Sequence, residues 1–148
     1  MSKNPALNAS LAELAAIVKR LNEETDKLNS VINDFEKSLV EMNPGFGLWY
    51  LNPIRTTTSA TPIARGTQFG FLKWEDEWRL WIRRGSFTKS GDEWVPSGLA
   101  DWKMLRLVEG TREERAAAVS HFGSFLDAMK EEAKARLKIL ERVRNGER

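Results

Sequence analysis

Cysteine is absent from this chain of 148 residues, and histidine occurs only once, at His121. Without cysteine the chain has no disulfide, no thiol nucleophile and no thiolate metal ligand. A structural or catalytic zinc site needs a cluster of histidine, cysteine or carboxylate ligands, and no such spacing occurs, so we expect no metal site. A lone histidine on a helix more often packs or faces solvent than acts as a base, so we expect no catalytic residue.

Long apolar runs and phosphate-binding glycine loops are also missing. No stretch approaches the ~20 apolar residues of a membrane-spanning helix. Glu13 and Lys19 interrupt the first twenty residues, which therefore lack a secretory apolar segment. These absences predict a soluble, cytoplasmic protein. Neither a Walker-type nor a dinucleotide-binding glycine pattern occurs, so we expect no cofactor and no enzyme of those classes.

Charge is nearly balanced, with 23 basic and 21 acidic residues and a net charge of +2. No block of like charge stands out along the chain. A general DNA-binding protein is expected to carry a basic stripe, and this chain has none. We therefore expect neither general DNA binding nor a membrane partner.

Tryptophan, by contrast, is concentrated in the middle of the chain. All six tryptophans lie between Trp49 and Trp102, and the segments on both sides have helical apolar spacing. The pattern predicts a single α+β domain over residues 1–148. We expect an N-terminal helix over 5–43, a Trp-rich antiparallel sheet of four or five strands over 46–109, and a C-terminal helix over 112–145.

The first helix has well-defined ends and a regular apolar face. Asn4-Pro5 is a favourable helix start, and Asn43-Pro44-Gly45 ends the helix. Large apolar residues recur in alternating steps of four and three, with Thr25 as the one polar residue among them. We call this set the α-seam; its members are Leu7, Leu11, Leu14, Val18, Leu21, Thr25, Leu28, Ile32, Phe35, Leu39 and Met42. Five heptads of this spacing are typical of a coiled coil.

Two pairings of this helix are open. In the first, copies of the chain form a homo-oligomer whose interface is Leu14, Leu21, Leu28, Ile32 and Phe35. In the second, the helix forms an intrachain hairpin with the last helix. The sequence does not choose the stoichiometry, because few charged residues flank the α-seam to select a partner. The last helix has a coiled-coil period too, begins with a capping box from Thr111 to Glu114, and contains Gly123, which weakens the helix locally.

The central region predicts a β-hairpin. Segments 67–74 and 78–87 are rich in aromatic and β-branched residues and are separated by Glu75-Asp76-Glu77. A three-residue turn would place Phe71 opposite Trp81, and a two-residue turn would place Gly70 there, so the register stays open. Further strands are expected over 47–51, around 94–95 and over 102–108.

A candidate ligand-binding surface follows from alternation on the second strand. Trp78, Leu80 and Ile82 form the core face, and Arg79, Trp81 and Arg83 form a basic-aromatic-basic row on the opposite face. The long loop 52–66 adds hydroxyl and guanidinium groups, which bind phosphate or carboxylate. The predicted ligand-binding residues are Arg55, Thr57, Thr58, Arg65, Arg79, Trp81 and Arg83.

Two functional hypotheses follow from these patterns. The first is a non-enzymatic, homo-oligomeric binding protein that captures an anionic planar ligand such as a nucleotide, as a sensor or a sequestering protein. An exposed tryptophan stacks on a planar ring, and arginine binds phosphate. The alternative is a structural or adaptor protein that uses its coiled coil and aromatic sheet face to bind proteins, with Trp81 covered by a helix of a neighbouring chain.

Overall fold

The computed structural model describes residues 4–50, 53–56, 63–91, 93–97 and 102–146. Thr57 and Thr58, both predicted to bind a ligand, lie outside these ranges. The backbone of Arg55 is described, but its side chain is not.

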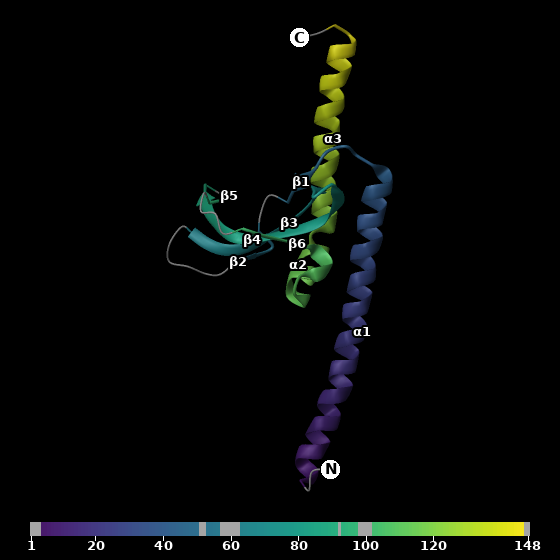
Figure 1. The fold of residues 1–148 in the computed structure, drawn as a ribbon, viewed down its shortest axis with the longest axis vertical. Helices are drawn as coiled ribbons and strands as arrows, with labels where there is room; N and C mark the ends of the chain where they lie inside the picture. Colours follow the sequence, from purple (N-terminus) through teal and green to yellow (C-terminus); the bar gives the residue numbers. More distant parts are fainter. Residues whose placement is uncertain (1–3, 51–52, 57–62, 92, 98–101, 147–148) are drawn as a thin grey trace.

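The architecture is α+β, as the sequence predicts (Figure 1). A long helix α1 (Pro5–Met42) precedes an antiparallel sheet, and two helices, α2 (Arg112–Ser120) and α3 (Phe122–Arg144), follow it. A 3-10 turn (Leu107–Glu109) links the sheet to α2. The helices gather on one face of the sheet, and α1 and α3 run in the same direction.

The ends of α1 follow from local chemistry. The side chain of Asn4 accepts a hydrogen bond from the backbone N–H of Leu7 and caps the first turn. At the other end, Asn43 adopts a left-handed conformation with φ of 51°, and Pro44 prevents the helix from continuing. The observed helix therefore ends within one residue of the predicted range.

The sheet is four strands wide and is built on two long central strands, β3 (Ile63–Trp74) and β4 (Glu77–Ser90). Two short segments, β1 (Leu48–Trp49) and β2 (Arg55–Thr56), pair with β3 along its free edge. Along the free edge of β4 lie β5 (Glu93–Pro96) and β6 (Lys103–Arg106). All pairings are antiparallel.

The β3–β4 hairpin has a two-residue turn, which resolves the open register. Glu75 and Asp76 both have positive φ, 49° and 64°, so the turn is of the mirror-image kind that matches the twist of paired strands. Gly70 therefore lies opposite Trp81, and Phe71 lies opposite Leu80. This register places Phe69 and Phe71 of β3 on the same face as Leu80 and Ile82.

The main core lies between this face of the sheet and the helices. Phe69, Phe71, Leu80 and Ile82 are fully buried there, together with Phe125 of α3. Phe69 stacks beside Tyr50 at 5.3 Å between ring centroids and packs against Phe125 at 5.1 Å. These aromatic contacts join β3 to α3.

The part of the α-seam from Leu28 to Leu39 packs inside the same chain, whereas Met42 at its end is exposed. Ile32 and Leu39 are buried in the main core, and Leu28 is partly buried against it. Phe35 stacks on Phe122 of α3, with ring centroids 4.1 Å apart. Ile32 and Phe35 were predicted as oligomer-interface residues; in the structure Ile32 is fully buried in the chain's own core, and Phe35 is partly buried against that core.

The predicted C-terminal helix is broken into two. At His121 the backbone leaves the helical conformation, with φ of −104° and ψ of 3°, so α2 ends and α3 begins there. The side chain of Tyr50 lies 3.3 Å from Nδ1 of His121, and the two rings pack together. The sequence predicts one helix that is weakened near Gly123, and the structure places a full break two residues earlier, at His121.

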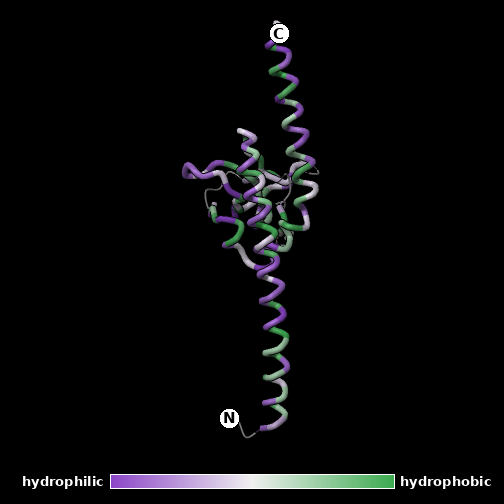
Figure 2. Tube along the Cα trace, turned by 90° about the vertical axis from the view of Figure 1, so that its right-hand side faces the viewer, coloured by the Kyte–Doolittle hydropathy of each residue, from purple (hydrophilic) through white to green (hydrophobic). Residues whose placement is uncertain are grey.

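Both long helices extend beyond the globular body, at opposite ends of the molecule (Figure 2). The first half of α1 projects one way, and the second half of α3 projects the other way. Leu14 and Leu21 of the α-seam are 55% and 44% exposed in this single chain. Because α1 and α3 run in the same direction, the predicted hairpin of antiparallel first and last helices is not formed (Figure 1).

Candidate functional site

The strongest candidate for a ligand site is an arginine between two tryptophans on the sheet face that points away from the main core. The guanidinium carbon of Arg83, on β4, lies 4.2 Å from the ring centroid of Trp49. It lies 5.3 Å from the ring centroid of Trp102, next to β6. We call these three residues the Trp–Arg stack. Cation–π contacts of this kind stabilise the charge on the guanidinium by about 0.5–2 kcal/mol.

Two glycines make room for the indole rings. A side chain at Gly70 would meet the backbone of Leu48 at 2.5 Å and the ring of Trp49 at 2.9 Å. A side chain at Gly85 would occupy the position of the Trp102 ring. The rings therefore lie against bare backbone, which brings both of them within reach of Arg83.

Arg83 differs from the other sheet arginines in its partners. Its Nε donates a hydrogen bond to Oε1 of Gln68, at 2.8 Å, and partial burial lowers the pKa of Arg83. Arg79, Arg84 and Arg106 each pair with a carboxylate. Among the described side chains Arg83 has no such carboxylate, so its positive charge is offset only by the two rings and an amide.

Trp81 does not offer an open stacking face. It is 8% exposed, and its indole Nε1 donates a hydrogen bond to the backbone carbonyl of Leu72, at 3.1 Å. Because Gly70 lies opposite Trp81, the large ring can lie over the neighbouring strand. The structure thus corrects the expectation of an exposed Trp81 that stacks on a planar ligand, and covers this ring within the chain itself.

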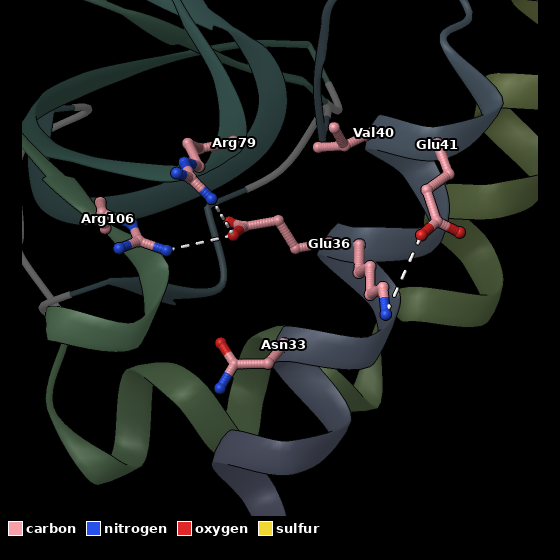
Figure 3. Close-up of a pocket in the computed structure, with 7 residues that line it drawn as sticks. Asn33, Glu36, Val40, Glu41, Arg79 and Arg106 are labelled. Carbon is pink, nitrogen blue, oxygen red and sulfur yellow. Dashed lines mark hydrogen bonds and ion pairs between the residues drawn. The ribbon is translucent and has the colours of Figure 1, made fainter.

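Arg79 contacts a buried carboxylate of α1 (Figure 3). Glu36 is 5% exposed and pairs with Arg79 at 3.3 Å and with Arg106 at 3.1 Å. It also accepts a hydrogen bond from the backbone N–H of Leu80, at 2.8 Å. The β6 pairing stops one residue later, at Trp81, so Glu36 satisfies an N–H that the sheet leaves free. This cluster borders a surface hollow of about 390 Å³.

A second buried carboxylate, Glu114, joins α2 to the sheet. Arg84 donates two hydrogen bonds to it, and the hydroxyl of Thr67 donates a third, at 2.7 Å. The backbone N–H of Thr111 donates a fourth, at 2.9 Å, which completes the capping box predicted at the start of this helix. Burial by itself would raise the pKa of Glu114, but these donors outweigh it and lower the pKa to about 2.

Sequence reasoning missed both carboxylate clusters. Glu114 is recognisable as part of a capping box, but that motif says nothing of Arg84 or Thr67. Glu36 occupies a position beside the α-seam, where a charged residue is ordinary. Glu36 forms an ion pair with Arg79, and Glu114 forms one with Arg84. Neither arginine therefore belongs to a free anion-binding surface.

Of the remaining predicted ligand residues, Arg65 is the one whose side chain the structure describes. Arg65 lies on β3 opposite Ser86 and is exposed. By strand alternation Arg65 lies on the opposite face of β3 from Gln68, the partner of Arg83. Of the predicted ligand residues with described side chains, Arg83 alone belongs to the Trp–Arg stack, and its partners Trp49 and Trp102 were not among the seven predicted residues.

In the described ranges no three side chains of the metal-binding types gather in one place, and no helix is long and apolar enough to cross a membrane. Comparisons with protein-family models, with curated proteins and with solved structures found no match to this chain.

Proposed function

We propose that this protein is a homo-oligomeric structural or adaptor protein that assembles through the first half of α1. The observation that carries the proposal is the exposed part of the α-seam. Its members are Leu7, Leu11, Leu14, Val18 and Leu21, each between 39% and 55% exposed. A contiguous exposed apolar surface of this kind is typical of an interaction site.

The projecting part of α1 has little to stabilise it within one chain. Contact with the body begins near Asn22, whose side chain accepts a hydrogen bond from Arg112, at 2.8 Å. The segment before it is about 25 Å long at the rise of an α-helix. Helices of this length are marginal in water without tertiary packing. A partner that covers the α-seam supplies that packing.

A second copy of the chain fits this surface chemically. The positions that flank the exposed α-seam in the heptad pattern are neutral, so two copies meet without repulsion between like charges. Those flanking residues are Asn8, Ser10, Ala15, Ile17 and Asn22. Thr25, whose hydroxyl bonds back to the carbonyl of Leu21, marks the boundary between the free part of the α-seam and the part packed within the chain.

Sedimentation of a charged variant tests the proposal. We expect the wild-type protein to sediment as an oligomer at micromolar concentration. The double variant Leu14→Glu, Leu21→Glu should sediment as a monomer, because two carboxylates per chain would have to be desolvated in the interface. Both residues lie outside the chain's own core, so the tryptophan fluorescence of the globular body should stay unchanged.

The matched control is Leu137→Glu, Leu140→Glu, which places the same charges on two leucines of α3 that are at least as exposed as Leu14 and Leu21. This control should keep the wild-type oligomeric state. A wild-type chain that sediments as a monomer across the micromolar range would rule out the assembly.

A second candidate function, anion capture, is supported by the Trp–Arg stack. Apart from the bond from Nε to Gln68, the guanidinium N–H groups of Arg83 have no acceptor among the described residues. Such groups bind phosphate or carboxylate strongly. Because Trp81 is covered and Arg83 itself packs on the rings of Trp49 and Trp102, the ligand this site supports is a small anion rather than a stacked planar ring.

Tryptophan fluorescence measures this capture directly, because two indoles touch Arg83. We expect inorganic phosphate to change the emission of the wild-type protein, with a weaker effect as ionic strength rises. Arg83→Lys should reduce phosphate affinity about tenfold or more, since lysine lacks the planar fork of donors. The control Arg142→Lys, on the exposed end of α3, should bind like the wild type. If millimolar phosphate left the tryptophan emission of the wild-type protein unchanged, anion capture would be ruled out.

A further inference from the structure

The second half of α3 carries an apolar surface that is separate from both the α-seam and the Trp–Arg stack. Leu137, Ile139, Leu140 and Val143 are between 56% and 67% exposed. This part of the helix extends beyond the body at the end opposite to the projecting half of α1 (Figure 2). The single chain therefore leaves this surface uncovered.

A hollowed groove continues this surface onto the body. Two hollows, of about 520 Å³ and about 300 Å³, adjoin along α3 and share Pro44, Phe46 and Ala133. Leu39 and Met129 line the smaller hollow, and Leu137 and Leu140 line the larger one. We call the two hollows together the Phe46 groove. It has two walls, one from the end of α1 with the turn that follows it and one from α3.

The Phe46 groove leads to a basic segment at the C-terminal end of α3. The charged side chains that line it are Lys130 and Arg136, and the guanidinium of Arg136 lies 4.8 Å from the ring centroid of Phe46. Each has an acidic neighbour on the same helix: Asp127 lies 3.7 Å from Lys130, and Glu132 lies 2.8 Å from Arg136. From Ala133 to Arg144 the chain has five basic residues and one acidic residue, a net charge of +4.

We propose that the Phe46 groove binds an acidic amphipathic helix of a partner protein. An amphipathic helix places a row of apolar side chains into a groove of this kind. Acidic residues beside that row would meet the basic end of α3. A partner helix would also cover the exposed leucines of α3, which the chain itself leaves in water.

Charge disfavours a second copy of this chain as the occupant. The projecting segment of α1, residues 5–21, has one acidic and two basic residues, so its net charge of +1 repels the basic end of α3. Two α3 ends would repel each other more strongly. The groove's two walls also distinguish it from the convex apolar surface with which an interfacial helix lies on a membrane.

Binding of a designed peptide tests the proposal. The probe is a labelled synthetic peptide of about 18 residues, long enough to be helical. It consists of alanine and glutamate, with leucines in alternating steps of three and four residues so that they share one face of the helix. The comparison probe has lysine in place of every glutamate. Fluorescence anisotropy with the full-length protein should show micromolar binding of the acidic peptide and at least about tenfold weaker binding of the basic one.

Variants connect the binding to the groove. Leu137→Glu, Leu140→Glu should abolish binding of the acidic peptide, and Lys134→Glu, Lys138→Glu should weaken it about tenfold or more. Val95→Glu, which places the same new charge on an exposed apolar residue of β5, should bind like the wild type. The assembly variant Leu14→Glu, Leu21→Glu should bind the peptide as well, because the groove lies elsewhere on the chain.

Four results would overturn the proposal. The first is no binding of the acidic peptide, and the second is equal binding of both peptides. The third is a wild-type oligomer that Leu137→Glu, Leu140→Glu dissociates, since a second copy would then occupy the groove. The fourth is binding to vesicles rich in phosphatidylserine without binding to the peptide, which would assign the surface to a membrane.

Discussion

Replacement of Glu114 by alanine should lower the free energy of unfolding by about 3 kcal/mol or more. Removing one partner of a buried ion pair typically costs 3–5 kcal/mol, because the other charge is left without compensation. Arg84 is partly exposed, so water offsets some of this loss, and we expect the lower end of that range. The variant also loses the hydrogen bonds from Thr67 and from the backbone of Thr111.

Urea denaturation measures this loss, and Glu113→Ala is the matched control. Glu113 is the next residue back in the same first turn of α2, but it is exposed, so its removal should change stability by less than about 0.5 kcal/mol. A loss for Glu114→Ala no larger than for Glu113→Ala would show that the cluster does not stabilise the fold.

The same carboxylate makes stability depend on pH. The folded-state pKa of Glu114, about 2, lies below its ordinary value of 4.5. The stabilisation from its ionised form is therefore fully present above pH 4.5 and is lost as the pH falls from 4.5 towards 2. In Glu114→Gln this part of the acid dependence should disappear, and a denaturation series over that pH window measures the difference.

Replacement of Phe69 by alanine should also have a large effect, a loss of about 3–5 kcal/mol in the free energy of unfolding. Phe69 is fully buried and contacts the rings of Tyr50, Phe122 and Phe125. Its removal leaves a cavity at the junction of β3 and α3, where rigid aromatic neighbours on three sides limit collapse.

Trp74→Ala is the control for Phe69→Ala. Trp74 lies at the end of the same strand and is 43% exposed, so its removal should cost less than about 1 kcal/mol. Equal losses in thermal or urea unfolding for the two variants would mean that the main core is not centred on Phe69.

Local signals in the sequence were sufficient for the helix ends and the fold class. Asn4-Pro5 and Asn43-Pro44 act within one turn of the helix that they bound, and the capping box joins Thr111 to a residue three positions away. Alternation along β4 correctly assigned Leu80 and Ile82 to one face of the strand and Trp81 and Arg83 to the other. This assignment also uses only neighbouring residues, because the two-residue period of a strand is a local property.

The hairpin register and the break in the last helix depended on more than local pattern. Glu75 and Asp76 are not the usual asparagine-glycine pair of a two-residue turn, yet pairing along the whole length of β3 and β4 holds both in positive φ. The ring of His121 packs against Tyr50, the residue that follows β1, at the point where the last helix breaks. The apolar period of the sequence does not show this break.

Residues of one type acquired different roles only through tertiary contacts. Arg79 and Arg83 look equivalent on alternate positions of one strand, but Glu36, more than forty residues earlier in the chain, binds the first and not the second. Glu36 also binds Arg106, seventy residues away. No short-range pattern contains such pairs.

The α-seam shows the same division. Its spacing is continuous from Leu7 to Met42 and establishes, from sequence alone, that one face of α1 is apolar along its whole length. Only the tertiary structure determines that the part from Leu28 to Leu39 is covered by the sheet and α3, while the part before Thr25 stays exposed. The physical reason is that periodicity specifies which face of a helix is buried, whereas the position of the globular body along the helix depends on contacts between distant segments.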